Sequence, residues 1–408
     1  MKCRFCDREL THEFIDLLNS PPSNSFLTEE QLNEPEIFYP LKLYVCDNCF
    51  LVQIDEYKKS DDIFNQDYAY FSSFSTTWLD HAKKYVNMIT DRLRLGAESH
   101  VMEIASNDGY LLQYFVQRHI PCLGIEPSAN TARVARGKGI ETLEEFFGVS
   151  LAERLAQEGN KADLIIGNNV LAHVPDVNDF VAGLKIVLKD KGVITLEFPN
   201  LMQLIEQNQF DTIYHEHFSY FSFSTAKLIF EKHGLELFDV EQISTHGGSL
   251  RIYGKHKDDA SKNISPKVTA LLDEEKSKGM QTTEYYDGFQ NKADRVKYAL
   301  IDFLIKQKKA GKKVAAYGAA AKGNTLLNYC GVKKDLIEFV VDASPHKQGM
   351  FLPGSHIPVV KEDEITRLKP DYVVILPWNI KDEISEQLDY IRAWEGKFIV
   401  PIPYIQVV

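Results

Sequence analysis

Short apolar runs alternate with helical patterns in two separate stretches of this chain, and this alternation limits the folds open to it. The first stretch has apolar runs at 101–105, 122–125, 164–168 and 193–198, and helical patterns at 75–95, 111–118 and 177–188. The second stretch has apolar runs at 314–317, 339–342 and 373–376. Because strands that alternate with helices form parallel sheets covered on both faces, we expect two Rossmann-like α/β domains.

Four of the six cysteines lie in the first 49 residues, as Cys3-x-x-Cys6 and Cys46-x-x-Cys49. Two such pairs predict a zinc site, and a site closed by four thiolates is structural because it leaves no position for a substrate. A disulfide pair and unrelated thiols are the alternatives, and a reducing compartment disfavours the disulfide pair. We therefore expect a zinc-binding module at 1–65, followed by α/β domains at 66–255 and 256–408.

The composition narrows the possible partners. The formal charge of −12 leaves no basic stripe for nucleic-acid phosphates, so a nucleic-acid partner is not expected. No apolar run approaches the ~20 residues that cross a bilayer, and the N-terminus has no secretory pattern. These features predict a cytoplasmic protein, a monomer or small homo-oligomer, that acts on a small molecule and has no membrane partner.

The turn after the first apolar run reads Glu103-Ile-Ala-Ser-Asn-Asp-Gly109. An acidic residue at a strand end followed by small residues is how class I methyltransferases hold S-adenosylmethionine. Glu126 ends the next strand about 20 residues later, where a carboxylate accepts ribose hydroxyls. A dinucleotide enzyme lacks support because GxGxxG is missing, and an ordinary α/β turn is the other alternative. The candidate cofactor-binding residues are Tyr70, Glu103, Ala105, Ser106, Asn107, Asp108, Gly109, Glu126, Pro127, Asn168 and Asn169.

The tetrapeptide Tyr214-His215-Glu216-His217 follows the last core strand of the first series. Ligands of such sheets bind at the carboxyl ends of the strands, and histidine titrates near neutrality. The spacing is not HExxH, and in an extended segment His215 and His217 would share a face opposite Glu216. A general base is the favoured interpretation, with a metal site and a structural loop as alternatives. His173, which follows the run at 164–168, is a further candidate, although a lone histidine is more often structural.

Three other segments supply candidate substrate-binding residues, which are Phe71, Ser72, His246, Lys322 and Asn324. The aromatic and hydroxyl residues at 68–75 suit a lid over the ligands or a packed linker. The paired glycines at 247–248 interrupt a strand pattern and suggest a bulge or a close backbone approach. At 318–325, small residues, a lysine and a helix start predict an anion site suited to a diphosphate, with tight packing as the alternative.

Together these motifs resemble those of the sugar C-methyltransferases that act on nucleotide-linked 4-keto-deoxysugars. The resemblance covers the whole chain and rests on the two CxxC pairs and on the segments at 70–73, 103–109, 214–217, 245–249 and 318–324. It implies a zinc module, a central class I methyltransferase domain and a C-terminal Rossmann-like domain, with substrate between the last two. It also implies that His217 is the base and that Tyr214 and Glu216 support it.

The implied reaction moves a methyl group from S-adenosylmethionine to C3 of the sugar. A C4 ketone acidifies the C3 proton, so His217 would remove it, Glu216 would orient the imidazole and Tyr214 would hydrogen-bond the enolate. The sulfonium already carries an activated methyl, so the zinc would have no catalytic task. Two alternatives stay open: an O- or N-methyltransferase for a small acceptor, and a non-catalytic, zinc-containing sensor of sugar nucleotides.

Overall fold

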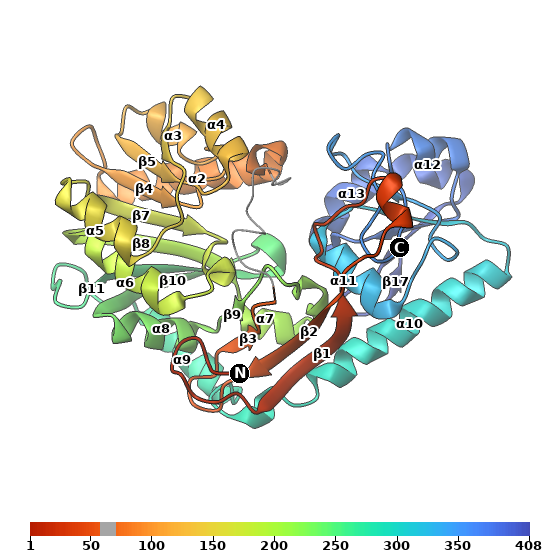
Figure 1. Cartoon of the computed structure of the whole chain (residues 1–408), viewed down its shortest axis with the longest axis horizontal. Helices are drawn as coiled ribbons and strands as arrows, with labels where there is room; N and C mark the ends of the chain where they lie inside the picture. The colour runs from red at the N-terminus through yellow and green to blue at the C-terminus, as the bar shows by residue number, and fades with distance from the viewer. Residues whose placement is uncertain (58–70) are drawn as a thin grey trace.

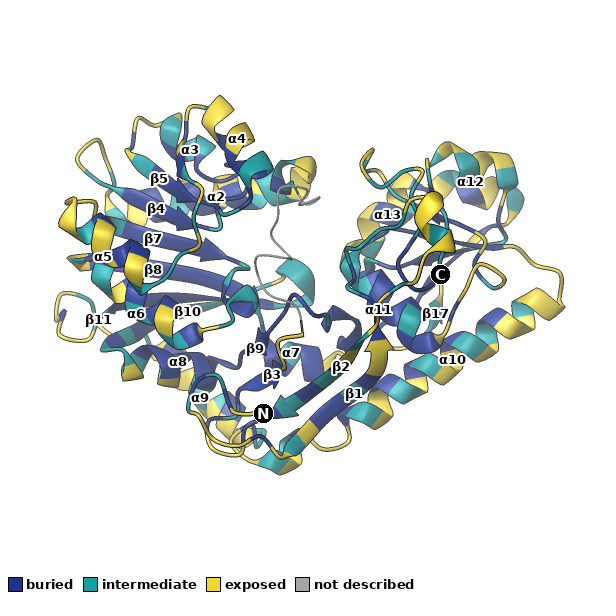
Figure 2. Cartoon of the chain, in the orientation of Figure 1, coloured by how far each residue is buried: buried dark blue, intermediate teal, exposed yellow. Residues whose placement is uncertain are grey.

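Three β-sheets organise the computed structural model, which describes residues 1–57 and 71–408. Figure 1 shows the two larger sheets side by side, each wrapped by helices, with the N-terminal strands below and between them. Strands of the larger sheets are buried almost throughout, whereas the outer faces of the helices are exposed (Figure 2). No helix among the described residues is both long and apolar enough to cross a membrane.

The N-terminal sheet has the order β1-β2-β3-β9 and is antiparallel throughout. Its strands are β1 (His12–Ser20), β2 (Tyr39–Val45), β3 (Val52–Ile54) and β9 (Ser219–Tyr220). The sequence predicts β2 and β3 but not β1, because two register shifts and a positive φ at Leu18 break the alternation of apolar and polar residues. The fourth strand comes from far along the chain, directly after the Tyr214–His217 tetrapeptide.

The central sheet has the order β10-β11-β8-β7-β4-β5-β6, and only β11 runs against its neighbours. Its strands are β4 (Val101–Ile104), β5 (Cys122–Ile125), β6 (Glu141–Leu143), β7 (Ala162–Asn168), β8 (Leu188–Pro199), β10 (Leu235–Ile243) and β11 (Ser249–His256). This is the predicted class I methyltransferase fold. The surrounding helices are α2 (Thr76–Leu93), α3 (Gln113–Val116), α4 (Ala129–Gly137), α5 (Val149–Gln157), α6 (Val177–Val187), α7 (Leu201–Glu206) and α8 (Phe223–Lys232).

Two helices connect the central sheet to the last one, as the polar stretch after residue 255 predicts. They are α9 (Pro266–Ser277) and α10 (Phe289–Lys309). In α10 the buried residues Phe289, Ala293, Val296, Leu300 and Leu304 recur every three or four positions, which gives one apolar face and leaves the other in water.

The C-terminal sheet has the order β14-β13-β12-β15-β16-β17, with only β17 antiparallel. Its strands are β12 (Val314–Tyr317), β13 (Val340–Val341), β14 (Val359–Val360), β15 (Tyr372–Ile375), β16 (Lys397–Val400) and β17 (Gln406–Val407), and its helices are α11 (Ala321–Cys330), α12 (Asp363–Leu368) and α13 (Lys381–Gln387). This is the predicted second Rossmann-like unit.

The strand order reverses beside β4 in the central sheet and beside β12 in the C-terminal sheet. At such a reversal, neighbouring connections leave the sheet in opposite directions and open a crevice at the carboxyl ends of the strands. Both sheets place loops from these ends on one shared cavity, so the fold brings two crevices to one site.

Candidate active site and zinc centre

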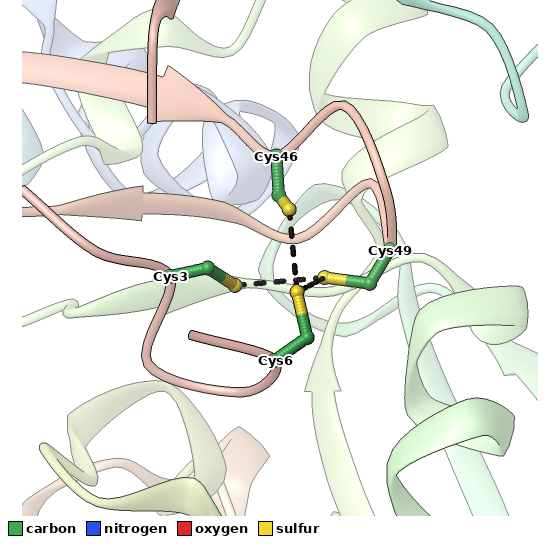
Figure 3. Close-up of side chains that lie close together, drawn as sticks. All are labelled: Cys3, Cys6, Cys46 and Cys49. Carbon is green, nitrogen blue, oxygen red and sulfur yellow. Dashed lines mark hydrogen bonds between the residues drawn. The ribbon is translucent and has the colours of Figure 1, made fainter. Parts of the chain in front are cut away.

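The four N-terminal cysteines form a compact cluster (Figure 3). The Sγ atoms of Cys3 and Cys49 are 3.5 Å apart, those of Cys6 and Cys46 are 3.5 Å apart, and all four lie within 4.8 Å of one another. Zn–S bonds of ~2.3 Å in a tetrahedron require a similar S–S spacing, so the cluster fits zinc. The Gln53 Nε2 group donates a hydrogen bond to Cys3 Sγ at 3.2 Å, as groups around structural zinc sites do.

Arg4, which lies between Cys3 and Cys6 in the sequence, joins the cysteine cluster to loops of the central unit. The Arg4 guanidinium donates to the Pro175 carbonyl at 2.9 Å and lies 5.4 Å from the centre of the Phe218 ring. Asn178 donates to the Arg4 carbonyl at 3.0 Å. The zinc-binding segment therefore holds both the loop that carries His173 and the strand that follows His217.

A cavity of about 630 Å³ lies where the three parts of the chain meet. The central unit contributes both its strand-end loops and the tetrapeptide, the C-terminal unit contributes the start of α11, and the N-terminal segment contributes Asn24. The sequence candidates on its wall are Ser72, Ala105, Asn107, Glu126, Pro127, Asn168, Asn169, His173, Tyr214, Glu216, His217, His246 and Lys322.

The tetrapeptide forms a tight turn, in which the His217 N–H donates to the Tyr214 carbonyl at 2.9 Å. The expectation that His215 and His217 share a face is therefore wrong. His217 and Tyr214 face each other with ring centres 4.0 Å apart, whereas the His215 ring packs 5.9 Å from that of Tyr39 and reaches the Pro40 carbonyl. The turn aims two rings and the Glu216 carboxylate at the cavity and buries His215 behind it.

Backbone carbonyls set the orientation of two imidazoles. His217 Nδ1 lies 3.2 Å from the Thr212 carbonyl, and His173 Nδ1 lies 2.8 Å from the Glu216 carbonyl. Because a carbonyl oxygen only accepts, each Nδ1 carries the proton and each Nε2 keeps a lone pair. The two rings are 4.7 Å apart. His217 is thus oriented by the hydrogen bond that its Nδ1–H donates to the Thr212 carbonyl, while the Glu216 carboxylate accepts a hydrogen bond from Asn24 at 2.7 Å.

The histidines of the cavity are neutral near neutral pH. Burial and the neighbouring His173 lower the pKa of His217 well below its usual range. Burial lowers the pKa of His173 to about 4, and burial together with Lys322 lowers the pKa of His246 to about 4. A neutral imidazole is the form that accepts a proton.

The loop after β4 bends sharply, with positive φ at Ala105 and Asn107 as well as at Gly109. The Glu126 carboxylate holds this bend, since it accepts from the Asn107 N–H and from the Ser128 N–H at 2.9 Å each. Ser106, Asp108, Gly109 and the fully buried Glu103 lie off the cavity wall. A Cβ on Gly109 would meet Ile140 at 2.3 Å, which explains the glycine.

The segment at 68–75 is described only from Phe71 onward, so Tyr70 lies outside the described residues. The Ser72 N–H donates to Asn107 at 2.9 Å, which joins the segment to the cofactor loop. Phe71 lies off the cavity wall and packs near His346, with ring centres 6.1 Å apart.

The Thr245–Ser249 segment is a turn between β10 and β11, with positive φ at His246, Gly247 and Gly248. A Cβ on Gly247 would lie 2.5 Å from the Trp378 ring, which confirms the predicted close approach. The Asn169 side-chain amide lies 3.1 Å from His246 Nε2 and fixes that ring on the cavity wall.

In the C-terminal loop the two candidate residues have different surroundings. The half-buried Lys322 lines the cavity, donates to Asn379 at 2.7 Å and lies 4.6 Å from the centre of the Trp378 ring. Asn324 lies off the cavity wall, and its side chain donates to the Ser23 carbonyl at 2.6 Å.

Several residues of the site carry no sequence signal. Asn24 and Lys347 line the cavity from loops without a recognisable motif. The buried Asp211 accepts a hydrogen bond from Trp378 Nε1 at 2.7 Å, and burial raises the pKa of Asp211 to about 6. Each of these contacts depends on distant parts of the chain meeting, so local spacing does not reveal it.

Comparison with known proteins agrees with this geometry. Three family models match the chain in succession: a zinc binding domain at 3–64, a methyltransferase domain at 78–240 and a C-methyltransferase C-terminal domain at 244–403. The C-methyltransferase NovU from Streptomyces niveus is 33% identical over 407 residues, which cover 100% of this chain and 96% of NovU.

This chain belongs to the C-methyltransferase family. It is an S-adenosylmethionine-dependent C-methyltransferase, with a structural zinc site in its four cysteines. Among more distant relatives, an ubiquinone biosynthesis O-methyltransferase from Bartonella bacilliformis is 26% identical over 126 residues, 30% of this chain and 51% of that enzyme. The crystal structure of magnesium protoporphyrin IX methyltransferase from Synechocystis with bound SAH covers 44% of this chain and 81% of its own, with 16% identity and a TM-score of 0.34.

Proposed function

We propose that this C-methyltransferase transfers a methyl group to C3 of a nucleotide-linked 4-keto-deoxysugar. The proposal rests on one observation above all: a neutral His217 shares a cavity with the cofactor loop and with two lysines of the C-terminal unit. A neutral base suits a carbon acid, and ammonium groups suit a diphosphate.

His217 is the base of the proposed reaction. Carbon becomes nucleophilic when a neighbouring carbonyl acidifies its proton, so a C4 ketone makes the C3 proton removable. The Thr212 carbonyl holds Nδ1–H of His217 and leaves Nε2 as the proton acceptor. His173 is held in the same way 4.7 Å away, which makes it the alternative base.

Tyr214 is the donor to the developing enolate oxygen in this proposal. It lines the cavity, and its ring contacts that of His217, so one turn presents base and donor to the same substrate. A donor that meets charge formed only late in the step stabilises the transition state more than the bound substrate.

In this proposal the central unit holds one ligand and the C-terminal unit holds the other. Ala105, Asn107 and Glu126 would hold S-adenosylmethionine, which supplies an activated methyl group. The start of α11, which carries Lys322, would hold the diphosphate of the sugar nucleotide together with Lys347, which lies in the loop after β13. Holding both ligands in register would supply much of the rate.

Solvent exchange at C3 tests the proposal without methyl transfer. The 4-keto sugar nucleotide is incubated in D₂O with S-adenosylhomocysteine, and deuterium is followed by NMR. Wild-type enzyme should exchange C3 and, with S-adenosylmethionine, methylate it, while His217→Ala should lose at least about a hundredfold in both rates. His119→Asn, at an exposed histidine, is the control.

Two results would contradict the proposal. Persistent C3 exchange in His217→Ala would assign the base elsewhere, with His173 tested next. Methylation of the reduced, 4-hydroxy sugar nucleotide would indicate an O-methyltransferase, because that compound has no acidic C3 proton. Thermal shifts with TDP-, GDP-, CDP- and UDP-sugars would then identify the nucleotide.

We also propose that the zinc module ends near residue 65 and the methyltransferase unit near residue 255. The proposed setting is the cytoplasm, where four reduced thiols persist to hold zinc. The enzyme is proposed to act as a monomer or small homo-oligomer. Gel filtration with light scattering tests the last statement.

A further inference from the structure

We propose that Asn24, from the N-terminal segment, is a positioning residue of the reaction that holds the Glu216 carboxylate in the active-site cavity. The proposal builds on the proposed function, because it assigns a part in that chemistry to a residue outside both α/β units. Asn24 lines the same cavity as Glu216 and His217. Its Nδ2 group donates to Glu216 Oε1 at 2.7 Å.

The segment around Asn24 is firmly held. The Asn324 side chain of α11 donates to the Ser23 carbonyl at 2.6 Å, and the buried Ser23 hydroxyl lies 3.4 Å from the Thr325 hydroxyl. Three residues further on, Leu27 exchanges two backbone hydrogen bonds with Phe351, at 3.0 and 2.8 Å. Asn24 is therefore supported on both sides by the C-terminal unit.

The same helix also holds the turn that carries Glu216. The Thr325 hydroxyl donates to the Ile213 carbonyl at 2.8 Å, immediately before Tyr214. Thr325 and Asn324 thus fix the turn and the Asn24 segment to one rigid support. This arrangement explains why Asn324 lies off the cavity wall: it places Asn24 and does not contact the ligand directly.

A fixed amide has a specific effect on Glu216. An N–H donor stabilises the ionised form of a carboxylate and restricts its rotamers. Glu216 is 6% exposed, so water cannot easily replace the lost donor. A carboxylate fixed in this cavity stabilises the imidazolium that forms when His217 accepts the proton. The other titratable groups on the cavity wall are Tyr110, Glu126, Glu145, His173, Asp176, Asp179, Tyr214, His217, His246, Lys322 and Lys347.

Asn24→Asp and Asn24→Ala separate donation from packing. Asn24→Asp keeps the shape but replaces the donor with a carboxylate that repels Glu216. We expect kcat to fall roughly ten- to a hundredfold in Asn24→Ala, further in Asn24→Asp at pH 8, and KM to change less than threefold. At pH 5.5 the Asp variant should recover relative to Asn24→Ala, because a protonated carboxyl donates again. Asn33→Ala, at an exposed asparagine of the same segment, should match wild type.

A second measurement does not depend on activity. A double-mutant cycle with Asn24→Ala and Glu216→Ala, followed by equilibrium unfolding of the zinc-loaded enzyme, should show that the two effects are not additive. Additive effects, or an Asp variant as active as wild type at pH 8, would overturn the proposal. If the wild type methylates no 4-keto sugar nucleotide, the proposed function fails, and the cycle still decides whether Asn24 holds Glu216.

Discussion

Single residues set the proton chemistry of the cavity. The carbonyls of Thr212 and Glu216 each bind an Nδ1–H group, which fixes two imidazoles with their lone pairs at Nε2. Burial then keeps both imidazoles neutral. Backbone carbonyls thus orient the imidazoles of His173 and His217, and burial sets their charge. Both effects occur although the tetrapeptide forms a turn and is not extended.

The lowered pKa values of the buried histidines predict how stability depends on pH. Folding lowers the pKa of His173 and His246 to about 4, so the unfolded chain takes up protons first as the pH falls. Their contribution is complete above ~6.5 and is lost as the pH falls toward 4. We expect the free energy of unfolding, measured by denaturant titration, to fall between pH 6.5 and 4.5. In His173→Gln this free energy should fall less over the same pH range. His119→Asn, at an exposed histidine, should leave the pH dependence of the free energy of unfolding unchanged. If it changed this dependence as much as His173→Gln does, the buried histidines would not be its source.

Substitution of Gly247 should lower the free energy of unfolding for two reasons, a steric clash and an unfavourable backbone conformation. Gly247→Ala adds a Cβ 2.5 Å from the Trp378 ring at a φ of +90°, whereas Gly139→Ala meets nothing within 4 Å at a φ of +79°. Both variants should lose ~1 kcal/mol in the free energy of unfolding, because alanine is unfavourable in the left-handed conformation. Only Gly247→Ala should lose clearly more than this. Thermal unfolding of the two variants, measured together, gives the difference. Equal losses would show that the contact with Trp378 relaxes freely.

Among the elements, the zinc-binding segment acts on loops that it does not belong to. Arg4 lies between Cys3 and Cys6 and donates to Pro175, two residues after His173. The adjoining strand β3 pairs with β9, two residues after His217. Zinc would therefore stabilise, through the backbone, the positions of His173 and of His217, the proposed base.

Removal of zinc should accordingly reduce both stability and activity. We expect elemental analysis to find one zinc ion per chain in the wild type and none in Cys46→Ser, which should also have a melting temperature lower by several degrees and reduced methylation. Cys122→Ser, at a cysteine outside the cluster, should retain zinc and activity. An active, zinc-free Cys46→Ser enzyme would show that the thiolate cluster does not position these loops.

At the scale of the whole molecule, Trp378 and Asp211 connect the two α/β units beside the cavity. Trp378→Phe removes the donor and leaves the buried Asp211 carboxyl without that partner. We expect a loss of about 1–3 kcal/mol in the free energy of unfolding. The KM for the proposed sugar-nucleotide substrate should rise, while the Kd for S-adenosylmethionine, measured by calorimetry, should stay constant. Trp394→Phe, at an indole bonded within the C-terminal unit, is the control.

The sequence predicts the elements better than their junctions. The runs at 122–125 and 314–317 coincide with β5 and β12, because fully buried parallel strands leave a continuous apolar signal. The cysteines are equally visible, and so are Ala105 and Asn107, which line the cavity from the loop after β4, since these signals are local. Asn24, Asp211 and Trp378 are not, because each acquires its partner only when distant segments meet. The hydrogen bond from Asn324 to the Ser23 carbonyl is hidden for the same reason.

The pairing of β3 with β9 also bears on biosynthesis. During translation the first three strands of the N-terminal sheet emerge early, but their last partner follows only after most of the central unit has been made. Long-range pairing of this kind closes slowly, since it must wait for a large loop to be ordered. The turn that carries His217 therefore reaches its final pairing only after the chain has been made through β9, and a nascent chain that ends before β9 leaves this edge of β3 without its strand partner.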